Sequence, residues 1–449
     1  MVAGPFSPPI ERRKLASRNE PAGLALRLAA IARLRRVLDG EAFSPIGATE
    51  MSDSRDRALA NRLVTTALRR HGHIDFILAE LLERGLPKKS GSFEAGLRIA
   101  IAQLVYLPDL GAHSAVHLAV EAVKRDRKAQ HLSGLMNAVL RRVQSHSARY
   151  WSLPESLLLP ADVARRWSAA YGEAAVEEFG AALLAGAPLD LTLKEMDRGL
   201  IAALGAEPVV ADTVRIASRD RTVDALPGYG EGRWWVQDVA SAVPARLLGL
   251  PQGAPVLDLC AAPGGKAAQL VKAGYQVTAL DNDAGRVERL RANLARLDYQ
   301  AEIVTADAKT YAPEVPYSGI LLDAPCSATG TFRRHPEVLW NRSAADIAGR
   351  VELQRTLLIN AVRCLEPAGV LIYCVCSLEP QEGEHQVTWA LDSLPELELA
   401  PIAPDEVPGL ETALTGQGTL RLHPGLDPGG VAGGMDGFFI ARLRRRPKA

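Results

Sequence analysis

Two cysteines and an aspartate lie just after apolar segments of the sequence, where a folded sheet could bring them together. Asp323 and Cys326 belong to the segment DAPCS, and Cys376 belongs to CVCSL. The runs before them, SGILL and GVLIY, are typical of buried parallel strands. In open α/β sheets the ligand crevice lies at the carboxyl ends of the strands. We therefore expect all three residues in one crevice, where a thiolate can be a nucleophile and a carboxyl group can move a proton.

Beside a bound methyl donor, these groups suggest methylation of carbon 5 of a pyrimidine. Carbon 5 is a poor nucleophile, but a thiolate that adds to carbon 6 makes the ring enamine-like and reactive. A carboxyl group near ring nitrogen 3 assists by donating a proton. Only the thiolate form of a cysteine reacts, and nearby positive charge favours that form. We expect arginines such as Arg333 to supply part of this charge, and a methyl donor that carries a sulfonium group would supply the rest.

The cysteines also admit other interpretations. The chain has five, an odd number that does not make a disulfide framework. We expect Cys364, inside a helical run, and Cys374, in mid-strand, to be core residues. A zinc site usually needs two separated ligand pairs, and only one Cys-x-Cys is present, so we expect no metal. Free cysteines point to a reducing compartment, and we expect a cytoplasmic protein.

A glycine turn in the segment LDLCAAPGGKAAQL indicates a binding site for a small molecule. Its Pro-Gly-Gly lets the backbone approach a ligand, and the start of the following helix favours an anion or carboxylate. The spacing matches neither G-x-G-x-x-G nor the P-loop, which disfavours a nucleoside triphosphate. Asp281 and Asp307 end the next two strands and are placed to hold ribose hydroxyls and an adenine amino group. These features suggest S-adenosylmethionine; the alternative is a tight turn with two helix-capping aspartates.

Hydrophobic periodicity divides the chain into four parts. We expect a disordered tail over 1–20 and a helical bundle over 21–145, where apolar residues recur at helical spacings. Residues 146–225 mix both patterns and predict a small α+β linker subdomain. Residues 226–449 alternate strands and helices, which predicts a doubly wound α/β sheet with GMDGFFIARLRR as an antiparallel edge strand. No apolar stretch approaches the ~20 residues of a membrane span, so no membrane partner is expected.

Charge is distributed unevenly, although the net charge is zero. Residues 1–150 contain 24 Lys and Arg against 14 Asp and Glu, so the rest of the chain is acidic by the same margin. A basic front part suggests a polyanion such as nucleic acid as its partner. The alternative is a solvated helical surface that is basic without such a partner.

Several motifs together resemble the RNA 5-methylcytosine methyltransferases. They are LDLCAAPGGK, LLDAPCSATGTFRRHPEVLW, the Cys-Ser of YCVCS, WVQDVAS and MDGFFIARL. In front of them, HSAVHLAVEAVK and GLMNAVLRRV resemble the helical RNA-binding domain of the antitermination factor NusB. The resemblance implies a Rossmann-like S-adenosylmethionine-dependent methyltransferase domain. An all-α NusB-like bundle and the small α+β linker subdomain would precede that domain.

The resemblance also implies a role for each candidate residue. Cys376 would be the nucleophile, Cys326 would help release the product, and Asp323 would lie beside the cofactor and the target base. The cofactor-binding residues would be Cys260, Ala261, Ala262, Pro263, Gly264, Gly265, Lys266, Asp281, Asp307 and Asp323. DNA cytosine-5 methyltransferases instead use the sulfur of their Pro-Cys motif as the nucleophile. Analogy with those enzymes would select Cys326.

The substrate implied by the resemblance is a cytidine of 16S ribosomal RNA, unstacked so that the thiolate can reach it. We expect a monomer whose basic helical part contacts phosphates. One rival hypothesis is a non-catalytic RNA-binding assembly factor that keeps the fold, although intact Asp323, Cys326 and Cys376 argue against it. Another is an amino-directed methyltransferase. Such enzymes typically carry Asp/Asn-Pro-Pro-aromatic, whereas this chain has Asp-Ala-Pro-Cys.

Overall fold

The computed structural model describes residues 21–216 and 221–447, and it divides the chain into two units. The N-terminal unit ends at Leu153 and the C-terminal unit begins at Pro154. The tail expected over residues 1–20 lies outside the described residues. Among the helices of the described ranges, none has the length and apolar character needed to cross a membrane.

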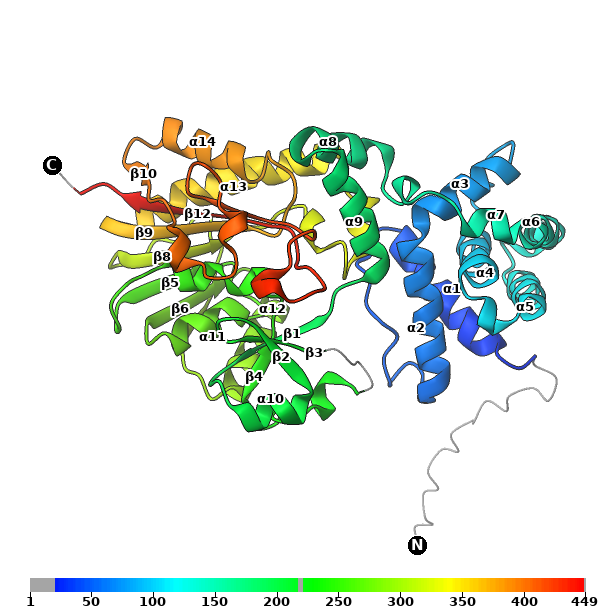
Figure 1. Cartoon of the computed structure of the whole chain (residues 1–449), viewed down its shortest axis with the longest axis horizontal. Coiled ribbons are helices and arrows are strands. Elements are labelled where there is room, and N and C mark those ends of the chain that lie inside the picture. Colours follow the sequence, from blue (N-terminus) through cyan, green and yellow to red (C-terminus); the bar gives the residue numbers. More distant parts are fainter. Residues whose placement is uncertain (1–20, 217–220, 448–449) are drawn as a thin grey trace, which may run out of the picture. The chain divides into compact units, whose positions relative to one another are not determined.

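The N-terminal unit is a bundle of α-helices, as predicted (Figure 1). Its helices are α1 Leu24–Leu38, α2 Ser54–Arg69, α3 His71–Leu81, α4 Phe93–Tyr106, α5 Ala112–Arg125, α6 Ser133–Ser145 and α7 Ser147–Trp151. Helix α4 is buried along almost its whole length, and the apolar stripes of its neighbours pack around it. At Arg70 the backbone leaves the helical conformation, which divides one continuous helical pattern into α2 and α3.

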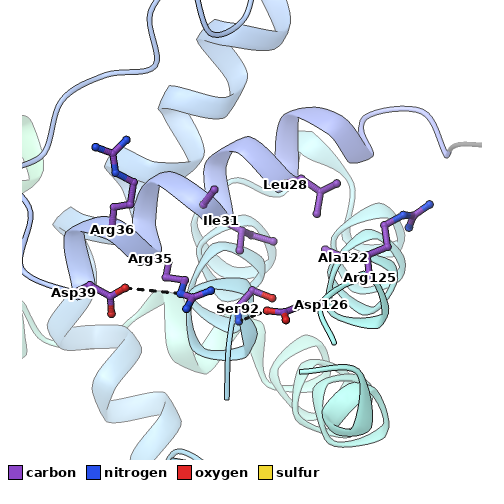
Figure 2. A pocket seen from close by; sticks show the side chains of 10 residues that line it. Leu28, Ile31, Arg35, Arg36, Asp39, Ser92, Ala122, Arg125 and Asp126 are labelled. Atoms are coloured by element: carbon purple, nitrogen blue, oxygen red, sulfur yellow. Dashed lines mark hydrogen bonds and ion pairs between the residues drawn. The ribbon is translucent and has the colours of Figure 1, made fainter. Parts of the chain in front are cut away.

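A pocket of the N-terminal unit lies beside α1 and α5 (Figure 2). It has apolar walls and a rim of arginines, formed in part by Leu28, Ile31, Ala122, Arg35, Arg36 and Arg125. These arginines have acidic partners: Arg35 lies 3.7 Å from Asp39, and Arg125 lies 3.6 Å from Glu121. All five cysteines belong to the C-terminal unit, so the predicted thiol chemistry has no place in this pocket.

The C-terminal unit begins with two helices and a small antiparallel sheet. Helices α8 Ala161–Tyr171 and α9 Glu173–Ala185 are separated at Gly172, whose φ of 87° suits a glycine that ends a helix. The strand order is β2–β3–β1–β4, with bounds Ala206–Val210, Thr213–Ile216, Leu189–Leu193 and Trp234–Val236. Helix α10, Arg198–Leu204, connects β1 to β2. Strand β4 is absent from the predicted elements, and its pairing with β1 extends this sheet beyond residue 225.

A larger mixed sheet positions the candidate site. Its strand order is β10–β12–β9–β8–β5–β6–β7, and β11 pairs with β12. The predicted apolar strands form its parallel part: β5 Pro255–Leu259, β6 Gln276–Asp281, β7 Glu302–Thr305, β8 Tyr317–Asp323 and β9 Leu365–Val375. The antiparallel strands are β10 Leu397–Leu399, β11 Leu420–Leu422 and β12 Phe438–Arg445. This arrangement confirms the predicted Rossmann-like α/β class.

The position of the last strand differs from the prediction. Strand β12 is antiparallel to β9, as expected, but it is not an edge strand. It lies between β9 and β10, and β11 also pairs with it. Strands β10 and β11 are three residues long, which is too short for a recognisable hydrophobic pattern.

Helices cover both faces of the large sheet (Figure 1). Helices α11 Gly265–Lys272 and α12 Ala284–Arg296 pack on one face, and α13 Ala344–Cys364 and α14 Glu384–Ser393 pack on the other. Successive strand residues point to opposite faces, so Val256 joins the first core and Leu257 joins the second. Because both faces are covered, the central strands are continuous apolar runs, and polar groups remain at their ends.

Candidate active site

The sulfur atoms of Cys326 and Cys376 lie 3.4 Å apart, although 50 residues separate them in the sequence. Strand β8 ends at Asp323 and the neighbouring parallel strand β9 ends at Val375, so their carboxyl ends meet at one edge of the sheet. Asp323 pairs in register with Cys374, and the loop after each strand therefore begins at the same level. The structure thus brings together the aspartate and the two cysteines that the sequence singles out.

The two thiols differ in their surroundings. A hydrogen bond with Cys376, burial, and the charges of Cys376 and Glu382 raise the pKa of Cys326 well above its ordinary value. The contact between the two sulfurs is a hydrogen bond in which either thiol can be the donor. A hydrogen bond of this kind stabilises a thiolate acceptor. Whichever sulfur is ionised is therefore stabilised by the other, and Cys326 is the one whose pKa is raised.

Asp323 is held by Lys266, whose ammonium group lies 2.7 Å from one carboxylate oxygen. The same ammonium group is 3.1 Å from Ser241 Oγ. The buried thiol of Cys374 lies 3.6 Å from the other oxygen of Asp323. Burial lowers the pKa of Lys266, but Asp323, Cys374 and Cys376 more than offset this, and the pKa lies above its ordinary value. Lys266 is thus a fixed cation between the carboxylate and the cysteines.

A pocket of about 450 Å³ opens beside these groups, within the size range of small-molecule sites. The glycine loop, residues 260–266, lines this pocket through residues 261–266, together with aromatic residues around β4 and the loop after β8. The lining includes Tyr229, Trp235, Gln237, Asp238, Ser241, Ala261, Ala262, Pro263, Gly264, Gly265, Lys266, Asp323 and Arg334. The pocket therefore offers aromatic faces next to fixed charges, which suits a flat polar ring.

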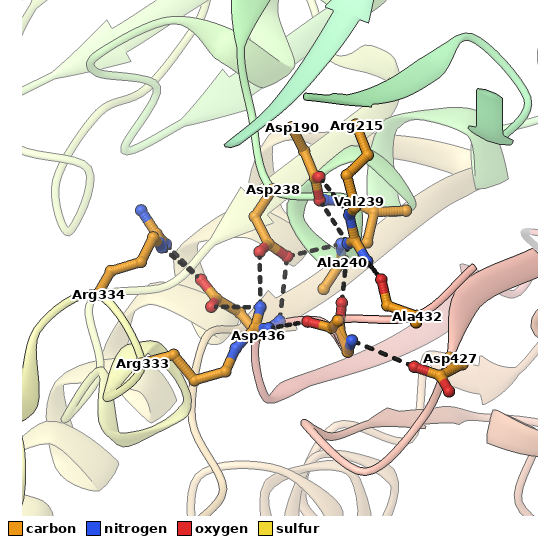
Figure 3. A network of polar contacts seen from close by, with 12 residues as sticks. Asp190, Arg215, Asp238, Val239, Ala240, Arg333, Arg334, Asp427, Ala432 and Asp436 are labelled. Atoms are coloured by element: carbon orange, nitrogen blue, oxygen red, sulfur yellow. Dashed lines mark hydrogen bonds and ion pairs between the residues drawn. The ribbon is translucent and has the colours of Figure 1, made fainter. Parts of the chain in front are cut away.

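The arginine next to the thiols is Arg334, not Arg333 as expected. Arg333 is buried, and its guanidinium group lies 3.1 Å from Asp238 and 3.2 Å from Asp436 (Figure 3). Arg334 pairs with the other oxygen of Asp436 and lines the pocket. Asp436 raises the pKa of Arg334, burial opposes this, and Asp238 and Cys376 raise it further. The charge of Arg334 therefore acts on Cys376.

The same polar network joins the small sheet to the segment before β12 (Figure 3). Arg215 of β3 donates to both oxygens of Asp190, at 2.8 and 2.9 Å. It also donates to the carbonyl oxygens of Ala432 and Gly434, each at 2.8 Å. Both side chains are buried, and their charges and hydrogen bonds satisfy one another, which connects β3 to the segment before β12.

A second pocket lies where β5, β6 and β7 end. It is lined by Cys260, Leu280, Asp281, Asn282, Arg286, Asp307, Ala308, Lys309, Pro325, Leu353 and Leu357. It combines two carboxylates with apolar walls, which fits the hydroxyl donors, amino donor and flat ring of a nucleoside. Asp281 accepts the N–H of Ala262 at 3.2 Å, and Asp307 accepts that of Lys309 at 2.9 Å, so both carboxylates are oriented by backbone.

The glycine loop lies between the two pockets. Cys260 lines the second pocket, whereas the next six residues, through Lys266, line the first. Burial raises the pKa of Cys260 to about 12, with Asp323 and Asp281 adding to the effect. Cys260 is therefore a neutral wall residue. In the described part of the chain, no group of three or more His, Cys, Asp or Glu side chains is arranged to hold a metal ion.

Comparison with known proteins decides which family has this architecture. Residues 245–444 match the model of the family described as 16S rRNA methyltransferase RsmB/F, and residues 26–145 match the NusB family. The chain is 36% identical to the ribosomal RNA small subunit methyltransferase B of Xanthomonas campestris pv. campestris, over 96% of this chain and 99% of that relative. The chain belongs to the 16S rRNA methyltransferase RsmB/F family.

A second relative agrees with the RsmB/F assignment, and a solved structure shares the fold. The ribosomal RNA small subunit methyltransferase B of Vibrio cholerae is 33% identical, over 94% of this chain and 98% of its own length. A crystal structure of PH0851 shares the fold with a TM-score of 0.75 and 22% identity, over 95% of this chain and 99% of that chain. As a member of the RsmB/F family with a NusB-like helical part, the protein is a methyltransferase.

The RsmB/F site also contains residues that the sequence did not single out. Ser241 lies in the WVQDVAS motif, but the motif alone does not reveal that Ser241 contacts Lys266. Leu353 and Leu357 are four residues apart on α13 and line the second pocket together. Helical spacing predicts that they share a face, but it does not tell which face meets a pocket. Arg286 and Asn282 carry no local signal of their position.

Gly330 is packed so closely against the end of β9 that a methyl group there should disturb the site. Its N–H donates to the carbonyl oxygen of Cys376 at 3.1 Å, and a Cβ would overlap the carbonyl of Gly437. We expect Gly330→Ala to lower the free energy of unfolding by about 1–3 kcal/mol and to reduce methyl transfer. Thermal unfolding and an activity assay measure the two effects.

Gly349 on α13 provides the matched control for Gly330. A Cβ at Gly349 would meet no atom within 4 Å. We expect Gly349→Ala to stabilise the helix by up to about 1 kcal/mol, because alanine is the better helix former. Equal unfolding temperatures for the two variants would contradict the packing argument.

Proposed function

We propose that this chain transfers a methyl group from S-adenosylmethionine to carbon 5 of a cytidine in 16S ribosomal RNA, through a covalent bond between Cys376 and carbon 6 of the base. The observation that carries the proposal is the pair of thiols 3.4 Å apart, next to an aspartate that Lys266 holds. Methylation of an amino group needs no sulfur nucleophile, whereas methylation of carbon 5 needs both attack and release. The names of the relatives support ribosomal RNA of the small subunit as the substrate.

The pocket at the ends of β5–β7 would hold S-adenosylmethionine. Asp281 would accept hydrogen bonds from ribose hydroxyls, and Asp307 would accept one from the adenine amino group. Pro325 and Leu357 would contact the ring. The glycine loop, residues 260–266, would surround the methionine part. When bound, S-adenosylmethionine supplies an electrophilic methyl group.

Cys376 would begin the reaction by adding its sulfur to carbon 6. Lys266 and Arg334 put positive charge beside this sulfur, which is the setting that stabilises a thiolate nucleophile. Asp323 would face the edge of the ring that carries nitrogen 3 and the amino group, where it assists the addition by proton transfer. It would also favour cytosine over uracil, because uracil has an acceptor oxygen in place of the amino donor.

Cys326 would assist the release of the product. The chief cause of its raised pKa is the hydrogen bond with Cys376. When Cys376 is bonded to the base it can no longer carry a negative charge, so this cause weakens and Cys326 can lose its proton to water. The sulfur of Cys326 would then take the proton from carbon 5. The ring regains its double bond as it expels Cys376.

Methyl transfer to unmodified 16S RNA from a labelled donor tests the proposal. The RNA is digested to nucleosides, and 5-methylcytidine is separated from N4-methylcytidine by chromatography with mass spectrometry. We expect the label in 5-methylcytidine. Label in N4-methylcytidine would contradict the covalent mechanism, and RNA binding with no transfer would favour an assembly factor instead.

A further inference from the structure

Glu382 is a fully buried carboxylate that receives four hydrogen bonds. One oxygen accepts from the backbone N–H of Ser327 at 2.9 Å and from the side chain of Gln354 at 3.1 Å. The other accepts from the hydroxyl groups of Ser327 and Ser377, at 2.5 and 2.6 Å. The hydroxyl of Tyr373 donates to the backbone carbonyl of Glu382 at 2.6 Å and fixes its main chain.

Three of the four hydrogen bonds to Glu382 come from the two loops that carry the cysteines, and the fourth comes from Gln354 on α13. Ser327 directly follows Cys326, and Ser377 directly follows Cys376. Gln354 also donates to the carbonyl of Pro325 at 3.1 Å, so both sides of Cys326 are connected to the same cluster. A single carboxylate therefore spans two segments that the sequence separates by 50 residues.

The electrostatics of Glu382 differ from those of a plain structural carboxylate. Within the described ranges, no ion pair joins Glu382 to a basic side chain, and hydrogen bonds alone hold its carboxyl group. Glu379, three residues earlier and equally buried, has the ordinary arrangement: Arg166 Nε lies 3.1 Å from its carboxylate and Trp167 donates to it at 3.1 Å. A carboxyl group with no basic partner is costly to bury, and groups of this kind are concentrated at functional sites.

We propose that Glu382 is a positioning residue, whose carboxylate sets the distance between the sulfurs of Cys326 and Cys376 by holding Ser327 and Ser377. The role of Glu382 in catalysis rests on the proposed function. The distance between the two sulfurs can be measured without RNA or cofactor. Reactive groups shifted by about 1 Å lose roughly 10²-fold in rate, so a link of this kind matters for catalysis.

A cross-linking experiment tests the link directly. Dibromobimane becomes fluorescent when it bridges two neighbouring thiols, and peptide mass spectrometry identifies the bridged pair. We expect Glu382→Leu to form the Cys326–Cys376 bridge roughly tenfold more slowly than wild type, and to lose kcat for methyl transfer without a change in KM for S-adenosylmethionine. Glu382→Gln should retain the bridge. Its amide oxygen can still accept from Ser327 and Gln354, while the two hydroxyl groups can turn to accept from its NH₂.

Two further variants make the outcome decisive. Glu379→Leu removes an equally buried carboxylate from the same segment and should bridge as fast as wild type. Ser327→Ala combined with Ser377→Ala removes the hydroxyl donors with little change in volume, and should slow bridging even if Glu382→Leu does not fold. Bridging at the wild-type rate in this double variant or in a folded Glu382→Leu would overturn the inference. If the bridging pattern holds but RNA receives no methyl group, the proposed function fails while the positioning role of Glu382 stands.

Discussion

Replacement of Cys376 by alanine is expected to abolish methyl transfer, with a loss on the order of 10⁴-fold or more, because the variant lacks the sulfur that would activate carbon 5. Cys376 lies at the end of β9 and is partly exposed, so the smaller side chain should leave the fold intact. Transfer of labelled methyl groups to unmodified 16S RNA measures the first effect. The temperature of thermal unfolding measures the second.

Cys364 provides the control for loss of a cysteine. It is buried at the end of α13, and its thiol donates to the carbonyl of Tyr311 at 3.5 Å, in the core between α13 and the sheet rather than in the crevice. We expect Cys364→Ala to unfold at a lower temperature but to transfer methyl groups at close to the wild-type rate. Normal turnover by Cys376→Ala would show that the assignment of the nucleophile is wrong.

Replacement of Cys326 by alanine is expected to accumulate a covalent complex between protein and RNA. The sulfur of Cys376 can still attack, but the group 3.4 Å away that would take the proton from carbon 5 is missing. The methylated adduct therefore cannot release its product at the normal rate. On a denaturing gel with labelled RNA, the complex should appear as a slow band that protease treatment removes.

Combining the two substitutions tests which cysteine attacks the base and which releases the product. The double variant Cys326→Ala with Cys376→Ala should form no adduct, because it lacks the attacking sulfur. An adduct in the Cys376→Ala single variant would instead assign the attack to Cys326, as in DNA cytosine-5 methyltransferases. The raised pKa of Cys326 argues against that outcome, because a thiol that keeps its proton is a weak nucleophile.

Long periodic segments were predicted correctly from the sequence. The helices of the N-terminal unit and strands β5, β6, β8 and β9 bury wide apolar surfaces, and burial on that scale imposes a pattern on the residues themselves. The shortest strands were not predicted from the sequence. Strands β4, β10 and β11 are three residues long and are held in place mainly by pairing with partners distant in the sequence.

Some site residues carry a signal in the local sequence, and others can be placed only from the folded structure. Asp323, Cys326 and Cys376 could be identified because a reactive side chain directly after an apolar strand is visible in the sequence. Arg333 and Arg334 are adjacent and chemically identical, and only the folded chain shows that one is buried between two aspartates and the other lines the pocket.

By itself, the sequence determined which chemical groups the protein has and at which strand ends they lie, since local pattern and residue type are properties of the chain alone. The tertiary structure decided how those groups act on one another. The 3.4 Å between two sulfurs, the charge of Lys266 against Asp323 and the hydrogen bonds of Glu382 all join residues far apart in the sequence. Electrostatic and hydrogen-bond energies depend on distances between atoms, and those distances exist only once the sheet has formed.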